Sequence, residues 1–143
     1  MLAILKRLAG RRRRAEGGQS LVEFVLVVPI FLLVLFAIVD FGMAFHAWIT
    51  VTNSAREGAR VGAVRATSAE IEQRVRDTAT SLEQADLSVA VTNAEGQPGG
   101  SVVVDVSYSY SLMTPLADLL NLVSGGAIPA TLNLSSTADM RLE

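Results

Sequence analysis

The chain has 143 residues, a length that suits one ordinary domain with a short appendage rather than two full domains. Half of its residues are hydrophobic, but all five Phe and the only Trp lie at positions 24–48, a concentration that argues against a simple soluble domain. The chain has no cysteine and a single histidine, His46, which excludes disulfides, thiolate metal sites and cysteine nucleophiles, and we expect no enzymatic activity, metal or cofactor.

Residues 1–18 are strongly basic, with six basic side chains and one acidic, Glu16, whereas the rest of the chain has six basic and thirteen acidic side chains. The four consecutive arginines at residues 11–14 form a pattern that also binds nucleic acid. Because they stand directly before an apolar run, we interpret them as a topology signal that stays on the cytoplasmic side of a membrane. We therefore predict a basic leader peptide at residues 1–18 and no nucleic-acid partner.

Residues 24–39 carry no charge and form the centre of a predicted membrane-spanning helix. At about 1.5 Å per residue these sixteen residues span roughly 24 Å, less than a hydrocarbon core of about 30 Å. Continuing the helix to Ile49 completes the span and puts Trp48 at an interface. Pro29 lies inside the run and predicts a kink, because proline removes a backbone donor. The sequence thus predicts a single pass through the lipid bilayer of the cytoplasmic (inner) membrane, with the N-terminus in the cytoplasm.

Small residues alternate with charged ones over residues 50–66, and we expect the helix to continue there as a stalk. Alanine and glycine would let another helix approach this segment closely. The alternative is a stalk surrounded by water, and the sequence favours neither. Residues 19–66 are therefore predicted to form one transmembrane helix and stalk.

Asp40 directly follows the apolar run, and two interpretations of its carboxylate stay open. The carboxylate could be buried between helices and pair with Arg56 or Arg60 of a neighbouring subunit. More often, an acid at the end of an apolar run is hydrated at the membrane interface, and we favour this second interpretation.

A small α+β head is predicted for residues 67–143, outside the cytoplasm. Thr67 and Glu70 form a capping box ahead of an amphipathic helix over residues 68–82. Two ion pairs at i,i+4 spacing are expected on this helix: Glu70–Arg74 and Glu72–Arg76. Three later segments alternate apolar and polar residues, as half-buried strands do: 87–92, 102–110 and 131–142. The head should therefore combine this helix with a three-stranded antiparallel sheet.

A leucine-rich segment, residues 116–123, lies between the last two predicted strands. Thr114 and Pro115 suit the start of a helix, and Gly125 and Gly126 suit its end. The segment has too many leucines for one face of a two-turn helix, so some of them should be exposed and contact a partner or the bilayer. The alternative, a flap that closes over the core of the head, is slightly favoured.

Glu23 stands at the start of the apolar run, where a carboxylate is costly. The cost is about 2.5–3.5 kcal/mol at the centre of a membrane helix and less near an interface, so such an acid is by default functional and needs a partner. If the chain is cut after Gly18, the new α-amino group of Gln19 lies about one helical turn before Glu23. The carboxylate then pairs with this amine locally or, in an assembly, with the amine of a neighbouring subunit.

Four features occur together in residues 17–60: Gly18 separated by four residues from Glu23-Phe24, Pro29, Asp40-Phe41-Gly42, and the run NSAREGAR at 53–60. In this combination the segment resembles the TadE-like minor pseudopilins of the Tad (Flp, tight adherence) type IVc pilus system. The resemblance covers roughly a third of the chain. The glycine–glutamate spacing alone is only moderately specific, but the four features together are a strong signal.

The resemblance implies cleavage between Gly18 and Gln19 by a membrane prepilin peptidase, with Glu23 as the assembly carboxylate. It also implies a minor subunit that supports pilus biogenesis, adherence and surface colonisation together with other Tad pilins, pseudopilins and the pilus assembly platform, and that can itself enter the pilus. Gln19 stands where many type IV pilins have Phe or Met, which argues against its N-methylation. The sizeable head favours a minor pseudopilin over the main pilin, which is very short in this system.

Two other classes of protein remain open. The first is an uncleaved single-pass membrane anchor that displays a small extracytoplasmic interaction domain. The second is a secreted protein whose N-terminal part is an ordinary signal peptide, which is weaker because Glu23 interrupts the start of the apolar region and no A-x-A site follows. No acid–base pair, nucleophile or phosphate-binding loop supports an enzyme.

Overall fold

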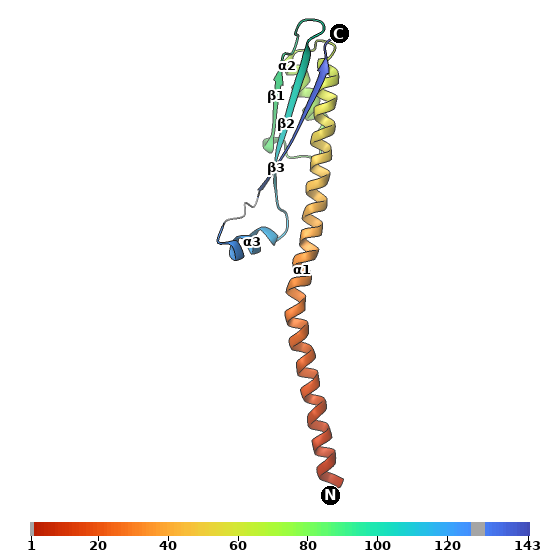
Figure 1. The fold of residues 1–143 in the computed structure, drawn as a ribbon, viewed down its shortest axis with the longest axis vertical. Coiled ribbons are helices and arrows are strands. Elements are labelled where there is room, and N and C mark those ends of the chain that lie inside the picture. Colours follow the sequence, from red (N-terminus) through yellow and green to blue (C-terminus); the bar gives the residue numbers. More distant parts are fainter. Residues whose placement is uncertain (1, 127–130) are drawn as a thin grey trace. The chain divides into compact units, whose positions relative to one another are not determined.

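The computed structural model describes residues 2–126 and 131–143, without the side chains of residues 2–17 and of Val123 (Figure 1). Its elements, in chain order, are α1 (Leu2–Gly62), α2 (Ser68–Thr78), the short 3-10 helix η1 (Gln84–Asp86), β1 (Leu87–Thr92), β2 (Ser101–Ser111), α3 (Leu116–Ser124) and β3 (Thr131–Arg141). The predicted α+β class is confirmed, because a long apolar N-terminal helix is followed by a short helix and a three-stranded antiparallel sheet. The charged side chains of the predicted leader lie outside the described residues.

The chain divides into two compact units, Met1–Ile38 and Val39–Glu143, and α1 contributes to both. In the first unit, α1 exposes large apolar side chains along its whole length from Leu21 to Ile38. A helix that is apolar on all sides is either buried or spans a membrane, and this one is not buried. In the part of the chain that the structure describes, Gly18–Gly62 of α1 is the one helix long and apolar enough to cross a membrane. Pro29 lies inside α1, and the helix continues past it.

In the second unit, the C-terminal part of α1 lies beside the sheet and α2 (Figure 1), and it packs against α2 and β2 through a face of small residues. Gly58 stands at the closest approach, because a Cβ atom there would lie 2.5 Å from Cγ2 of Val75 and 3.3 Å from Cγ1 of Val104. No side chain larger than a hydrogen fits this gap unless its neighbours move. Most of the fully buried residues of the core come from these three elements, and one more, Ala79, follows the end of α2: Val51, Ala55, Ala59, Ile71, Val75, Ala79, Val102, Val104 and Val106.

This packing decides between the two interpretations of residues 50–66. The small residues do permit a close approach, and the elements that approach are α2 and β2 of the same chain. The interpretation as a stalk surrounded by water is wrong for this face. It is correct only for the opposite side of the helix, where Arg56 and Arg60 are exposed.

The start of α2 is confirmed, whereas its predicted end is wrong. Thr67 Oγ1 accepts a hydrogen bond from the Glu70 backbone N over 3.3 Å, and Glu70 Oε2 accepts one from the Thr67 backbone N over 2.9 Å, which completes the predicted capping box. The helix ends at Thr78 rather than at Leu82. The chain turns at Ala79, and this turn brings the Leu82 side chain into the hydrophobic core.

One of the two ion pairs expected on α2 forms. Arg76 Nη2 lies 2.8 Å from Glu72 Oε1, as the i,i+4 spacing predicts. Glu70 does not pair with Arg74, because its carboxylate is held in the capping box while Arg74 reaches Glu57 on α1. A contact between two helices, Arg74 with Glu57, thus forms in place of the pair expected within α2.

The sheet has the order β1-β2-β3, and both pairs of neighbouring strands are antiparallel. Val106 is opposite Val89 and Val104 is opposite Val91, so the apolar faces predicted from the period of two coincide. On the other side, Val104 is opposite Ala138 of β3. The central strand β2 therefore supplies the buried valines against which α1 packs.

The leucine-rich segment forms α3 with Pro115 before it and Gly125, at a φ of 63°, after it. Among the described residues, neither the buried core nor the partly buried side chains packed against it include any residue of α3. Leu119 and Leu122 are exposed. The favoured interpretation of this segment as a flap over the core is therefore wrong.

The close approach at Gly58 predicts that Gly58→Leu lowers the free energy of unfolding by about 1–3 kcal/mol, since the added side chain overpacks the core. Gly42→Leu is the matched control on the same helix, because no atom lies within 4 Å of a Cβ at that position. Thermal unfolding of the detergent-solubilised protein, followed by circular dichroism, measures both. Equal midpoints for the two variants would contradict the packing argument.

Candidate functional site

Gly18, Gln19 and Glu23 lie near the start of the apolar part of α1, and all three are exposed. Gln19 Nε2 donates a hydrogen bond to Glu23 Oε1 over 3.2 Å, so residue 19 lies one turn from the carboxylate on the same face. No atom lies within 4 Å of a Cβ placed at Gly18. The site therefore combines a glycine with free space around it and an exposed carboxylate that accepts a hydrogen bond from the side chain of residue 19.

Asp40 is the other acid of the apolar region, and it is buried in the second unit with 2% of its surface exposed. Its Oδ1 accepts hydrogen bonds from the backbone N of Met113 over 2.9 Å and of Thr114 over 3.2 Å, and its Oδ2 accepts one from Thr114 Oγ1. Thr114 Oγ1 in turn accepts from the backbone N of Leu116, the first residue of α3, over 3.3 Å. We call Asp40, Met113 and Thr114 the Asp40 cluster. Its three donors satisfy the carboxylate without a counter-ion.

Tyr110 of β2 contacts the same turn of α1. Its hydroxyl donates to the backbone carbonyl of Asp40 over 3.5 Å, and its side chain is buried. Burial raises the pKa of Tyr110, and the charges of Asp40 and Tyr108 raise it further. The phenol therefore stays protonated at any physiological pH and remains a hydrogen-bond donor to α1.

The interpretation of Asp40 as hydrated at the interface is wrong, because its side chain is buried. Among the described residues of the chain itself, Arg60 pairs with Glu57 and Arg56 is exposed, and pairing of Asp40 with an arginine of a neighbouring subunit stays a prediction. Sequence reasoning missed Met113 and Thr114 as partners of Asp40. They lie more than seventy residues further along the chain, and no local pattern links them to it.

Glu57 joins α1 to α2 through Arg74 and also pairs with Arg60 of its own helix. Its Oε1 lies 2.7 Å from Arg60 Nη2 and 2.6 Å from Arg74 Nη2. The hydrogen bonds from Arg60 and then Arg74 lower the pKa of Glu57 to about 2. Sequence reasoning did not single out Glu57, although its i,i+3 spacing from Arg60 was a usable signal.

The lowered pKa of Glu57 predicts a loss of stability in acid. The folded protein binds fewer protons at this group than the unfolded chain, so the contribution is complete above the ordinary pKa of 4.5 and is lost as the pH falls towards about 2. We expect the unfolding midpoint of Glu57→Gln to fall less steeply than that of the unmodified protein over this pH window, as measured by thermal unfolding. Parallel pH profiles for the two proteins would contradict the role of the pair.

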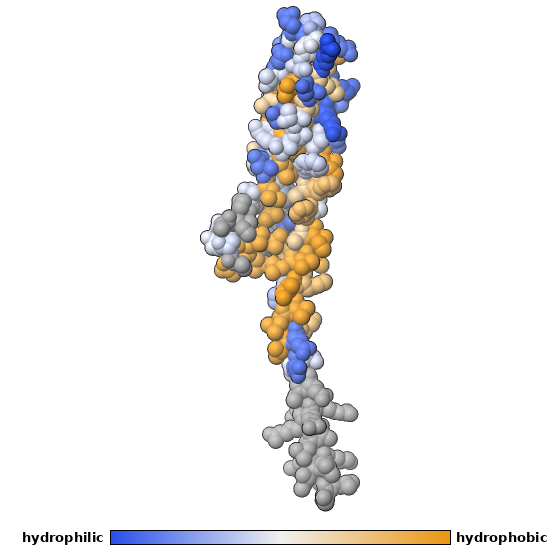
Figure 2. All heavy atoms as spheres, in the orientation of Figure 1, coloured by the Kyte–Doolittle hydropathy of each residue, from blue (hydrophilic) through white to orange (hydrophobic). Residues whose placement is uncertain are grey.

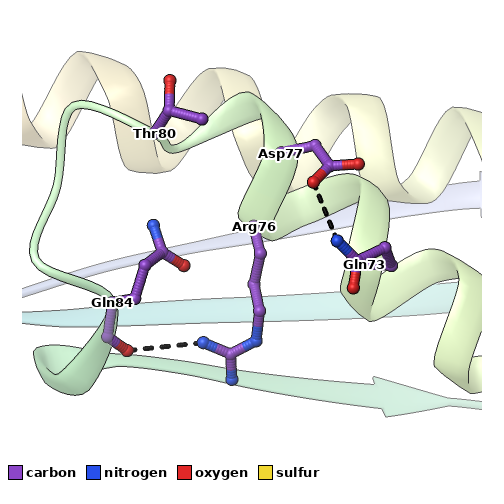
Figure 3. A pocket seen from close by; sticks show the side chains of 5 residues that line it. All are labelled: Gln73, Arg76, Asp77, Thr80 and Gln84. Atoms are coloured by element: carbon purple, nitrogen blue, oxygen red, sulfur yellow. Dashed lines mark hydrogen bonds between the residues drawn. The ribbon is translucent and has the colours of Figure 1, made fainter.

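The surface of the second unit has depressions, including two that are large enough to receive a small ligand. The first is lined by Gln73, Arg76, Asp77, Thr80 and Gln84 (Figure 3). Two hydrogen bonds join its lining residues, since Gln73 donates to Asp77 over 2.8 Å and Arg76 donates to the Gln84 backbone carbonyl over 3.4 Å, whereas Gln84 Oε1 is buried without a partner.

The second depression lies between α1 and the end of the sheet next to the Asp40 cluster. Its lining is mainly apolar and aromatic: Met43, His46, Ala47, Ser81, Leu82, Tyr108, Tyr110 and Met113. His46 is exposed at its rim. Within residues 18–126 and 131–143, no three His, Asp or Glu side chains come close enough together to hold a metal ion.

Comparison with known protein families matches residues 18–60 to the family described as TadE-like protein. The match starts at Gly18 and ends at Arg60, so it includes Glu23 and Asp40 but none of the strands. The resemblance predicted from the sequence is confirmed over this segment. Neither the curated proteins nor the solved structures contain a match to the chain.

Proposed function

We propose that this chain, which is TadE-like over residues 18–60, is a minor pseudopilin of a Tad (Flp) pilus system. A TadE-like segment within a single exposed apolar helix fits a membrane protein associated with such a pilus. In this proposal the N-terminus stays in the cytoplasm, α1 crosses the inner membrane once, and the second unit lies outside. The protein has a structural rather than a catalytic role, and its partners are a prepilin peptidase, other Tad pilins and pseudopilins, and the assembly platform.

The observation that carries the proposal is the arrangement of Gly18, Gln19 and Glu23 at the start of the exposed apolar helix. A peptidase cut after Gly18 would create an α-amino group at Gln19, whose side chain already reaches the Glu23 carboxylate. The amine and the carboxylate would then lie about one turn apart on one helix face. A free acid in this position serves no purpose in a simple anchor, because it makes insertion more costly.

The glycines before the cut favour processing. The backbone is helical at Gly18, so a peptidase must unwind the chain locally to reach the peptide bond. Gly17 and Gly18 each disfavour the helix by about 1 kcal/mol relative to alanine. The two glycines therefore make this the part of α1 that opens most easily next to Glu23.

Assembly would use the charge of Glu23. In a low-dielectric layer, a carboxylate and an ammonium group attract each other far more strongly than in water. The Glu23 carboxylate of one subunit can exchange its local partner for the Gln19 amine of its neighbour, which neutralises both charges in the assembled filament. This pairing would hold adjacent helices in a fixed register.

Processing at Gly18 is tested by the N-terminal sequence and intact mass of the protein extracted from its native membrane. We expect the unmodified chain to begin at Gln19 and Gly18→Ala to keep its leader, since alanine stabilises the helix and adds a methyl group beside the cut. The fold should not change, because the space around Gly18 is open. Gly42→Ala, which is also in open space, is the control and should be processed normally.

A native chain that still carries its arginine-rich leader would instead favour the second candidate, an uncleaved single-pass anchor that displays a small extracytoplasmic domain. Clean processing of Gly18→Ala would place the cut elsewhere. Either result would remove the argument for pairing between Gln19 and Glu23.

The assembly role predicts that Glu23→Ala is inserted into the membrane and cut but supports no pili, as judged by electron microscopy of the cells. Glu23→Gln keeps a hydrogen-bond acceptor for Gln19 but loses the charge, so it should fail as well, whereas Glu23→Asp should keep part of the activity. Normal piliation by the Glu23→Ala strain would refute the role assigned to this carboxylate.

A further inference from the structure

α3 exposes apolar side chains that none of the described residues covers. Leu122 is 79% exposed, and Met113, just before the helix, is 71% exposed. Leu119 lies one turn before Leu122 on the same side and is also exposed. A two-turn helix that packs on no core and shows leucines to its surroundings needs a partner surface.

The Asp40 cluster fixes where α3 starts. Met113 and Thr114 donate to the carboxylate of Asp40, and Thr114 also accepts from the first residue of α3. Around Asp40, α1 exposes further large apolar side chains, among them Phe41 and Phe45. Hydrophobic residues of α3 and of the neighbouring turns of α1 thus gather in one region of the second unit, as Figure 2 shows.

The position of Asp40 along α1 indicates how deep this apolar region would lie in a membrane that α1 crosses. From Phe24, the first residue after Glu23, the helix rises about 24 Å to Asp40, which is less than the thickness of the hydrocarbon core, about 30 Å. With Glu23 at one boundary, Asp40 lies at or just inside the opposite boundary. A bare carboxylate is costly there, whereas one that accepts three hydrogen bonds is tolerated.

We propose that α3 is a second membrane contact, which lies in the interface of the leaflet facing the second unit with Met113, Leu119 and Leu122 among the lipids. The proposal rests on the membrane insertion of α1 described above. We favour lipid as the partner of α3 because its exposed apolar side chains lie next to those of α1 at the Asp40 cluster, so that one apolar surface includes both. Asp118 lies one turn before Leu122 at i,i+4 spacing, so its exposed carboxylate marks the edge of the apolar surface that remains with the headgroups and water.

The composition of the segment defines the kind of lipid contact. Residues 113–126 contain no lysine or arginine, so electrostatic attraction to anionic headgroups does not contribute. The contact is purely apolar, as for an interfacial helix that binds by buried area alone. It should therefore persist when anionic lipid is replaced by zwitterionic lipid.

The chain has no cysteine, so one environment-sensitive label can be attached to each of three single-cysteine variants of the full-length protein. Leu122→Cys reports on α3, Val34→Cys reports on the span of α1, and Thr92→Cys reports on the end of β1 away from the Asp40 cluster. Each is reconstituted in vesicles of phosphatidylethanolamine and phosphatidylglycerol. Quenching is measured with a doxyl-labelled lipid and with aqueous iodide.

We expect the lipid quencher to act on the labels at Val34 and Leu122, and iodide to act on the label at Thr92. Lipid quenching at Val34 but iodide quenching at Leu122 would overturn the contact of α3 while leaving the anchor intact. A Leu122 label reached by neither quencher would show that protein rather than lipid covers α3, which also overturns the proposal. Loss of lipid quenching at Val34 would overturn membrane insertion and the inference together.

The role of Asp40 is tested in the Leu122→Cys background. Asp40→Ala removes the acceptor for Met113 and Thr114, so lipid quenching at Leu122 should be lost while the circular dichroism of the sheet is retained. Asp40→Asn keeps an acceptor oxygen and is the matched control, with quenching largely preserved. Unchanged quenching in Asp40→Ala would show that the cluster does not seat α3 at the membrane.

Discussion

The close contact of α1 with β2 and α2 is the constraint on which the second unit depends. Gly58 lets the helix backbone approach until its neighbours Ala55 and Ala59 are fully buried against valines of the sheet. The same helix continues, in sequence, from the apolar run of the first unit. The helix that is apolar enough to cross a membrane therefore also supplies one side of the hydrophobic core. The sheet cannot bury its valines, and so cannot fold, without this helix. This coupling makes residues 39–62 part of the second unit, although the sequence suggested a separate stalk.

Two acidic residues of α1 bind neighbouring parts of the second unit, and they do so by different kinds of interaction. Glu57 is exposed enough to be shared by two arginines, and its pairing ties α1 to α2. Asp40 is buried and is satisfied by neutral donors from the chain before α3. Hydrogen bonds from backbone N–H groups stabilise a carboxylate without bringing a second charge into a low-dielectric region. The chain thus uses ion pairs where water reaches and neutral donors where it does not.

The periodic and capping patterns predicted the elements well, because they depend on neighbours within a few residues. The capping box at Thr67, the three strands and the apolar helix are all of this kind. The predictions that failed depend on contacts distant in sequence. Hydration of Asp40 was the reasonable expectation from its neighbours alone, and only the fold brings Thr114 to it. The pairing of Arg74 with Glu57 rather than Glu70, the early end of α2 and the failure of α3 to close over the core have the same origin.

The two acids of the apolar region also differ in what they leave available to other molecules. Asp40 has its acceptor capacity used within the chain, so it is poorly suited to pair with a neighbouring subunit. Glu23 accepts from a flexible glutamine side chain and is exposed, so a stronger donor can replace that partner at little cost. Both positions lie in the segment that is TadE-like. This difference supports a division of roles, in which Asp40 builds the subunit and Glu23 serves its assembly with others.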